Sequence, residues 1–228
     1  MGRSDTCQFT GLKWATIDIQ SVRGVKLTDK WGRVSDNSVR TCGTGCVQST
    51  LQASAVSELY WTIPCEEFGN NLVTSYGSTI RYKINYNGHQ QASAFVCASI
   101  RGQSSTYFSR CNSIPQSGAD STFELHENTW MQPNNKAVTR ERFMMLLARC
   151  KTISIRAKFN SDTNQVSLSN IQYDKAIDGN TGNPVSTVET CECPVGYTGN
   201  FTRKCISARK KIIFAMNLFI ISIRRTVM

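Results

Sequence analysis

Cysteine is the residue with the most chemistry to offer in this 228-residue sequence, where it occurs ten times. In an oxidising compartment so many thiols form disulfides, whereas a reducing cytosol would leave them free and prone to oxidation. Six of them lie between residues 42 and 150, an even number, but the spacing does not give their pairing. We predict disulfides at Cys7, Cys42, Cys46, Cys65, Cys97, Cys111, Cys150, Cys191, Cys193 and Cys205.

Zinc binding is the alternative use of these thiols, since Cys42 and Cys46 are spaced like a ligand pair. A structural zinc site needs four ligands, commonly from paired C-x-x-C motifs or from histidine. The sequence has no such paired motif and only two histidines, His89 and His126. We therefore favour disulfides and predict neither a metal nor another cofactor.

Groups suited to catalysis are present without the surroundings that catalysis requires. A hydrolytic triad needs Ser, His and Asp that converge, and neither histidine lies near a G-x-S-x-G motif. The acidic pairs Glu66–Glu67 and Glu124–Glu127 belong to no recognisable motif, and no Gly-rich loop is built to hold phosphate. We predict that the protein is not an enzyme.

Positive charge is in excess, with a formal net charge of +10, half of it in residues 206–228. The basic residues of 1–205 are spread over predicted strands and form no basic helix, so we expect no nucleic-acid partner. A mildly basic surface suits either solubility or a polyanion such as heparan sulfate. The residues predicted for polyanion contact are Arg81, Lys83, Arg156 and Lys158.

Period-two hydrophobic alternation predicts three long strands. It runs through residues 80–86 and 152–159, placing Arg156 and Lys158 on the wet face, and through 165–176, where a slip at Ser169–Asn170 indicates a β-bulge. Shorter strands are predicted at 59–64, 93–99, 106–110 and 121–127.

A single short helix is predicted within 138–150. Thr139 is placed to cap its N-terminus, and Val138 and Phe143 are placed to form a hydrophobic staple. Because no βαβ alternation is present, we predict an all-β fold: an antiparallel, jelly-roll-like β-sandwich with one short helix.

The C-terminal run from Cys191 to Gly199, C-x-C-P-x-G-Y-x-G, resembles the start of a laminin EGF-like module. Three longer segments resemble laminin domain IV type A. They are LYWTIPCEEFGNNLVTSYGSTIRYKINYNG at 59–88, FELHENTW at 123–130 and VTRERFMMLLARCKTISIRAKF at 138–159. GRSDTCQFTGL, at 2–12, resembles the end of an EGF-like half-module. These segments most resemble the sequence of a laminin gamma chain, and laminin alpha chains and perlecan contain related domains.

The resemblance implies a domain order. We expect the end of a split EGF-like module at 1–13, laminin domain IV at 14–188 and the second EGF-like half at 189–205. Residues 206–228 do not fit the family, and we interpret them as an artefact of the gene model. Position 202, where the family pattern places cysteine, is Thr, which creates a glycosylation sequon at Asn200.

The implied function is structural: a spacer module of a secreted basement-membrane glycoprotein. Its partners would be other laminin chains or matrix glycoproteins, and its signal peptide would lie upstream, since the first residues contain no apolar signal core. The apolar run at 212–223 is too short to span a membrane, so no transmembrane segment is expected.

Two alternatives remain open at this point. One is a lectin-like module, with Trp61, Trp130 and Tyr107 as candidate residues for stacking on sugar rings, although aromatic residues of a sandwich more often belong to its core. The other is a heparan-sulfate-binding module using the four basic residues named above.

Overall fold

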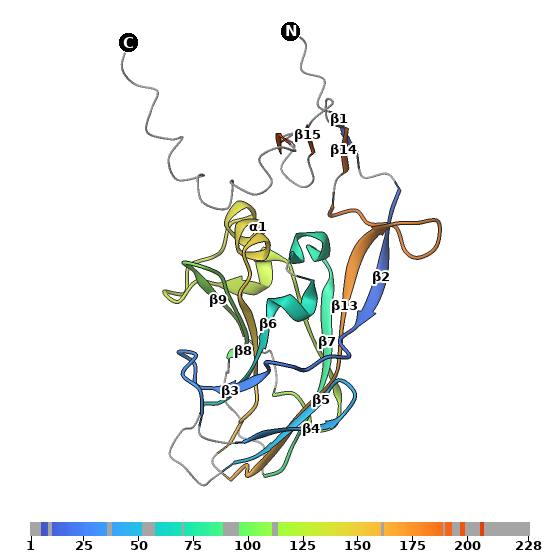
Figure 1. Cartoon of the computed structure of the whole chain (residues 1–228). Coiled ribbons are helices and arrows are strands. Elements are labelled where there is room, and N and C mark those ends of the chain that lie inside the picture. The colour runs from blue at the N-terminus through green and yellow to red at the C-terminus, as the bar shows by residue number, and fades with distance from the viewer. Residues whose placement is uncertain are drawn as a thin grey trace. The chain divides into compact units, whose positions relative to one another are not determined.

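The computed structural model describes residues 6–8, 11–35, 38–51, 58–69, 71–88, 96–110, 114–160, 162–188, 190–192, 197–198 and 206–207. The chain divides into two compact units, one of Trp14–Ile177 and one that combines Met1–Lys13 with Asp178–Met228. Most of the described strands lie in the first unit (Figure 1).

Two antiparallel six-stranded sheets build the larger unit. The first sheet has the order β10-β7-β13-β5-β4, with β2 also paired to β13. Its strands are β2 (Leu12–Asp18), β4 (Val39–Gly43), β5 (Cys46–Thr50), β7 (Thr79–Tyr86), β10 (Asp120–Glu124) and β13 (Gln165–Asp178).

The second sheet has the order β11-β9-β8-β12-β6-β3. Its strands are β3 (Lys26–Thr28), β6 (Tyr60–Pro64), β8 (Val96–Arg101), β9 (Thr106–Arg110), β11 (Trp130–Met131) and β12 (Thr152–Arg156). Neighbouring strands in this sheet come from distant parts of the chain, since β12 pairs with both β6 and β8. The predicted β-sandwich is confirmed.

The core lies between the inward faces of the sheets and obeys the predicted alternation. Along β7 the side chains of Ile80, Tyr82, Ile84 and Tyr86 are buried, while the residues between them are at least partly exposed. The second sheet contributes buried side chains at Leu27, Trp61, Ile63, Ala98, Ile100, Tyr107, Ile153 and Ile155.

The slip predicted in the last long strand is confirmed. The pairing of β13 with β7 shifts register between Ser169 and Gln172, and Asn170 has a φ of 52°. A bulge places one extra residue on the strand, so Val166 and Leu168 before it and Ile171 and Tyr173 after it are all buried.

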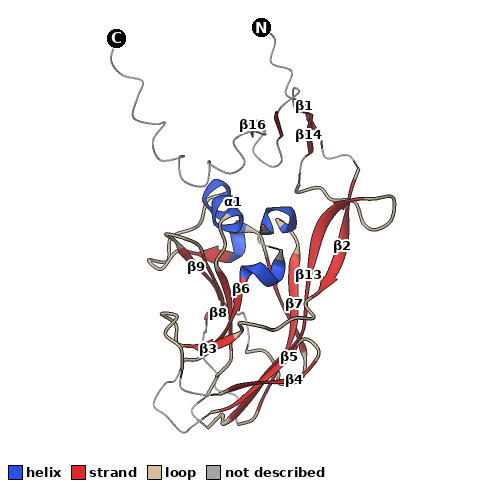
Figure 2. Cartoon of the chain, viewed as in Figure 1, coloured by secondary structure: helices blue, strands red, loops and turns tan. Residues whose placement is uncertain are grey.

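The helices gather at one end of the larger unit (Figure 2). They are the 3₁₀ helices η1 (Cys65–Phe68), η2 (Leu72–Ser75) and η3 (Glu127–Thr129) and the α-helix α1 (Arg140–Ala148). Thr139 caps α1 as predicted, its side chain accepting a hydrogen bond from the Arg142 amide, and the staple residues Val138 and Phe143 are both buried.

The smaller unit contains two short ladders among its described residues. In one, β1 (Thr6–Gln8) pairs antiparallel with β14 (Thr190–Glu192), and the backbone of Cys7 lies opposite that of Cys191. In the other, β15 (Tyr197–Thr198) pairs antiparallel with β16 (Ile206–Ser207). The backbones of Lys13 and Pro184 also form a bridge.

Candidate functional site

Two disulfides join four of the cysteines predicted to form such bonds. Cys42 bonds Cys46 across the turn from β4 to β5, so these two residues are not zinc ligands here. Cys65 bonds Cys150 and connects the ends of the neighbouring strands β6 and β12, 85 positions apart in sequence. Cys97 is also disulfide-bonded. The side chains of Cys7, Cys111, Cys191, Cys193 and Cys205, as well as Asn200 and His89, fall outside the described residues and remain predictions.

The segments that resemble laminin domain IV meet around Tyr76. Its hydroxyl donates a 2.5 Å hydrogen bond to the Glu127 carboxylate, and its ring stacks on His126 with a centroid distance of 5.4 Å. The Arg140 guanidinium lies 5.1 Å from the centre of the same ring. Burial and the neighbouring carboxylate both raise the pKa of Tyr76, so the hydroxyl stays protonated as a donor. The cluster therefore joins η2, η3 and α1.

The aromatic residues proposed for sugar stacking belong to the core. Trp61 is 0% exposed, Trp130 is 1% exposed and Tyr107 is buried. Each lies at an inward-facing position of the second sheet, which alternation alone did not reveal for these short strands. They are therefore not available to stack on a ligand at the surface.

Arg156 and Lys158 were expected on the wet face and are instead buried, with 3% and 2% exposure. Strand β12 ends at Arg156, and the amides of Ala157 and Lys158 both donate to the Leu59 carbonyl, so strict alternation stops there. The Arg156 guanidinium donates to the Lys158 carbonyl at 2.7 Å and lies against the ring of Tyr60. Burial raises the pKa of Tyr60 to about 12, against the opposing effect of this guanidinium.

Arg81 and Lys83 lie on the outer face of the first sheet, as predicted, but both have acidic neighbours. Arg81 binds Asp174 through two hydrogen bonds, of 2.5 and 2.9 Å, and the Lys83 ammonium lies 3.6 Å from Asp120. The structure thus separates the four predicted basic residues into an ion-paired surface pair and a buried pair. Polyanion contact at Arg81 and Lys83 remains a prediction.

The Arg81–Asp174 ion pair is expected to stabilise the fold at neutral pH and to lose this effect in acid. Burial alone would raise the pKa of Asp174, but hydrogen bonds from Arg81 and Thr16 and the charge of Arg81 hold it below its ordinary value. A depressed pKa stabilises the fold above the unfolded-state value of about 3.9 and loses that effect as the pH falls through the lower folded-state pKa. We expect Asp174→Asn to destabilise the protein at pH 7 and to differ less from wild type near pH 2.

Urea unfolding at the two pH values measures this difference. Asp120→Asn is the matched control, because the Asp120 carboxylate is largely exposed and its replacement should change the midpoint little. A destabilisation by Asp174→Asn of equal size at both pH values would contradict the role assigned to the carboxylate charge.

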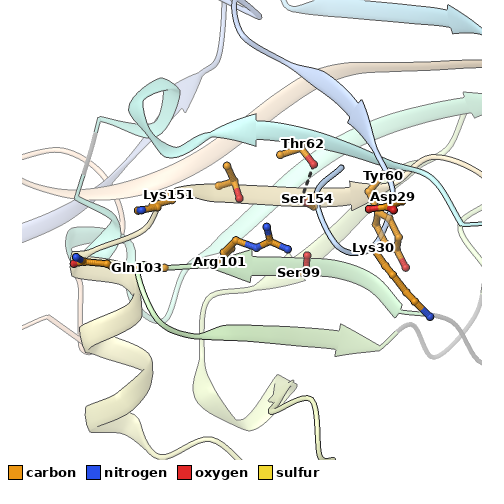
Figure 3. Close-up of a pocket in the computed structure, with 12 residues that line it drawn as sticks. Asp29, Lys30, Tyr60, Thr62, Ser99, Arg101, Gln103, Lys151 and Ser154 are labelled. Carbon is orange, nitrogen blue, oxygen red and sulfur yellow. Dashed lines mark hydrogen bonds between the residues drawn. The ribbon is translucent and has the colours of Figure 1, made fainter. Parts of the chain in front are cut away.

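A polar groove crosses the outer face of the second sheet (Figure 3). It is a cavity of about 370 Å³ lined by Asp29, Lys30, Gly32, Tyr60, Thr62, Ser99, Arg101, Gly102, Gln103, Lys151, Thr152 and Ser154. We call these twelve residues the polar groove. The volume is within the range of about 300–1,000 Å³ typical of small-molecule sites.

Strand register places the hydroxyl groups of this groove in one row. Thr62 pairs with Ser154 across β6 and β12, and Ser154 pairs with Ser99 across β12 and β8. The Thr62 and Ser154 hydroxyl oxygens are 2.9 Å apart, and the Thr28 hydroxyl oxygen lies 2.8 Å from that of Thr62. The sequence could not show this row, because it depends on strands that are distant along the chain.

The turn that follows β3 forms the rim. The Asp29 carboxylate accepts hydrogen bonds from the amides of Trp31 and Arg33 and from the Arg33 side chain, which closes the turn. Arg101 donates to the Trp31 carbonyl at 2.9 Å. Gly32 has a φ of 84°, which strains any other residue, and a Cβ there would lie 2.5 Å from an Arg101 nitrogen and displace the guanidinium. Trp31 itself is 65% exposed.

Sequence analysis missed this turn as a functional feature. The signal was present in Asp29-Lys30-Trp31-Gly32, since Asp at the first position and Gly at the fourth are typical of a type I turn.

Among the residues that the structure describes, no helix is long and apolar enough to cross a membrane.

Comparison with known proteins gives one family. The sequence model of laminin B (domain IV) matches residues 60–189. The basement membrane proteoglycan of Caenorhabditis elegans is 28% identical over 90% of this chain and 6% of its own length. Human laminin subunit alpha-1 is 25% identical over 92% of this chain and 7% of its own length. The chain thus spans well under a tenth of these curated relatives.

Among solved structures, the L4b domain of human laminin alpha-2 has the same fold. It superposes with a TM-score of 0.60 at 18% sequence identity and covers 71% of this chain and 96% of the domain.

Proposed function

Because this chain belongs to the laminin B (domain IV) family, we propose that it acts as a globular spacer module in a secreted basement-membrane glycoprotein. The names of its relatives, a basement membrane proteoglycan and a laminin subunit, support this location. The disulfides at Cys42–Cys46 and Cys65–Cys150 suit an oxidising extracellular environment. The role is architectural and includes no chemical step.

The pairing of β1 with β14 is the observation that supports the spacer role. Thr6 lies opposite Glu192 and Gln8 opposite Thr190. The chain between Gln8 and Thr190 therefore begins and ends at the same short ladder. A segment attached in this way can be inserted into a neighbouring module while keeping that module's two halves together.

The partners in this proposal are the other chains and glycoproteins of the matrix. Relatives named as laminin subunits support association with laminin-type chains in the full-length protein. Such contacts would use the outer faces of the sheets, because the inner faces are consumed by the core.

Localisation tests the proposed function directly. An antibody raised against residues 14–188 is expected to stain extracellular sheets in non-permeabilised tissue of the source organism. Staining should persist after mild detergent extraction, which removes soluble secreted proteins. Staining that requires permeabilisation would contradict the extracellular role, and loss on mild extraction would contradict incorporation into the matrix.

A distance measurement tests the ladder. Spin labels introduced at positions 6 and 192 by a non-cysteine chemistry should give a short, narrow distance distribution, since antiparallel partners have Cα atoms about 4.5–5.5 Å apart. Labels at positions 26 and 192 provide a comparison pair that is not joined by a ladder. A broad distribution for 6 and 192 would contradict an insertion whose two ends meet.

A further inference from the structure

The polar groove carries more positive charge than negative. Lys30, Arg101 and Lys151 line it, and Asp29 is its one carboxylate. That carboxylate already accepts three hydrogen bonds from the turn, two of them from Arg33, which does not line the groove. The groove is therefore complementary to an acidic ligand.

Lys151 is the most available of these cations. It is exposed, and none of the described ion pairs or side-chain hydrogen bonds involves its ammonium group. Lys30 differs, since its ammonium lies 3.7 Å from Glu58. Arg101 uses one nitrogen to hold the Trp31 carbonyl, which leaves the rest of its planar fork to face the groove near Ser99 (Figure 3).

Between the cations the floor of the groove offers neutral hydrogen-bonding groups. The hydroxyls of Thr62, Ser154 and Ser99 can each donate and accept, and they follow one another across three strands. Such a row matches a ligand with several hydroxyl groups better than it matches a small inorganic ion, which would need only one cluster of donors.

Trp31 adds an apolar surface beside the groove, between the lining residues Lys30 and Gly32. Its side chain is 65% exposed, and its backbone amide and carbonyl are held by Asp29 and Arg101. Its ring has a Lys30 ammonium 5.2 Å from its centre, so charge and aromatic surface are presented together.

We propose that the polar groove binds an acidic oligosaccharide, one that carries sulfate or carboxylate groups on hydroxyl-rich sugar rings. Trp31 provides the platform on which a sugar ring stacks, the Thr62–Ser154–Ser99 row binds ring hydroxyls, and Arg101 and Lys151 bind the acidic groups. This binding function goes beyond the spacer role and does not depend on it.

Calorimetric titration of the secreted, disulfide-bonded protein tests the proposal. The probes are a heparin-derived hexasaccharide, the same hexasaccharide after chemical desulfation, and sodium sulfate alone. We expect the sulfated hexasaccharide to bind, more weakly as salt rises, and the other two to bind at least about tenfold more weakly. Equal binding of the desulfated sugar, or no binding of the sulfated one, overturns the proposal.

Variants locate the site. Trp31→Ala and Lys151→Ala are each expected to weaken binding about fivefold or more, and Arg101→Ala about tenfold or more. Circular dichroism verifies folding, and the first two variants alter exposed side chains whose loss does not threaten it. Lys136→Ala, an equal loss of charge in the turn after β11, is the matched control and should bind like wild type.

Two outcomes of the same series contradict the assignment. Unchanged binding by Trp31→Ala together with weakened binding by Arg101→Ala would indicate a site for simple anions rather than for a sugar. Loss of binding in Lys83→Ala but not in Lys151→Ala would place polyanion binding on the first sheet. Neither result would affect the proposed spacer role, which the localisation experiment tests separately.

Discussion

Replacing Cys65 and Cys150 together with alanine is expected to lower the free energy of unfolding by about 4–5 kcal/mol. The bond closes a loop of 85 positions, and in the chain-entropy account a longer loop restricts the unfolded chain more. Cys65 is also almost fully buried, beside strands β6 and β12, whose ends the bond joins. Urea unfolding followed by circular dichroism gives the value by linear extrapolation.

The second disulfide supplies the matched control. Cys42 and Cys46 are separated by only four positions, so the same chain-entropy account gives about 2 kcal/mol for the Cys42→Ala/Cys46→Ala double variant. A larger loss for this pair than for Cys65–Cys150 would show that loop length does not decide how much each bond contributes.

Trp130→Ala is expected to be nearly as damaging, at about 3–5 kcal/mol. Trp130 packs edge-on against Phe123 of the first sheet and at a tilt against Phe143 of α1, with both centroid distances 5.8 Å. Its indole nitrogen donates a 2.7 Å hydrogen bond to the Glu124 carbonyl. Truncation therefore leaves a large cavity where both sheets meet the helix.

Trp31→Ala removes the same side chain from an exposed position and should change stability by no more than about 0.5 kcal/mol. Trp130→Phe separates the two contributions at the buried site. It keeps a ring but loses the hydrogen bond to Glu124, and we expect it to cost less than Trp130→Ala. Equal effects of alanine at positions 31 and 130 would contradict the assignment of Trp130 to the core.

The sequence was most informative where burial is strictly one-sided. In β7 and β13 every second side chain faces the core, so alternation predicted both strands and the bulge at Ser169–Asn170. Helix α1 was found from its cap and staple, which are local interactions.

The N-terminal strands escaped prediction for a physical reason. Strand β3 has three residues, and the edge strand β4 is almost entirely exposed, so neither leaves a hydrophobic period in the sequence. Burial of Arg156 and Lys158 was missed because it depends on contacts at the end of β12, with Leu59 and with Tyr60 of the neighbouring strand β6.

The polar groove could not be predicted as a site because its residues come from four separated segments of the chain. Ser99, Ser154 and Thr62 look like ordinary wet-face residues in their own strands, and only the register of three strands aligns them. The family resemblance, in contrast, rested on contiguous segments, and several of these meet at the Tyr76 cluster.

The β1–β14 ladder also determines how mechanical tension would act on this domain. Thr6 and Glu192, which lead to the two ends of the chain, form the outermost pair of the ladder. A pull on both ends therefore opens the ladder one pair at a time, beginning at Thr6 and Glu192 and ending at Gln8 and Thr190. Until that last pair separates, the load runs through three residue pairs and bypasses the sandwich between them. Tension between the two ends would therefore open the short ladders β1–β14 and β15–β16 before it loads the sandwich.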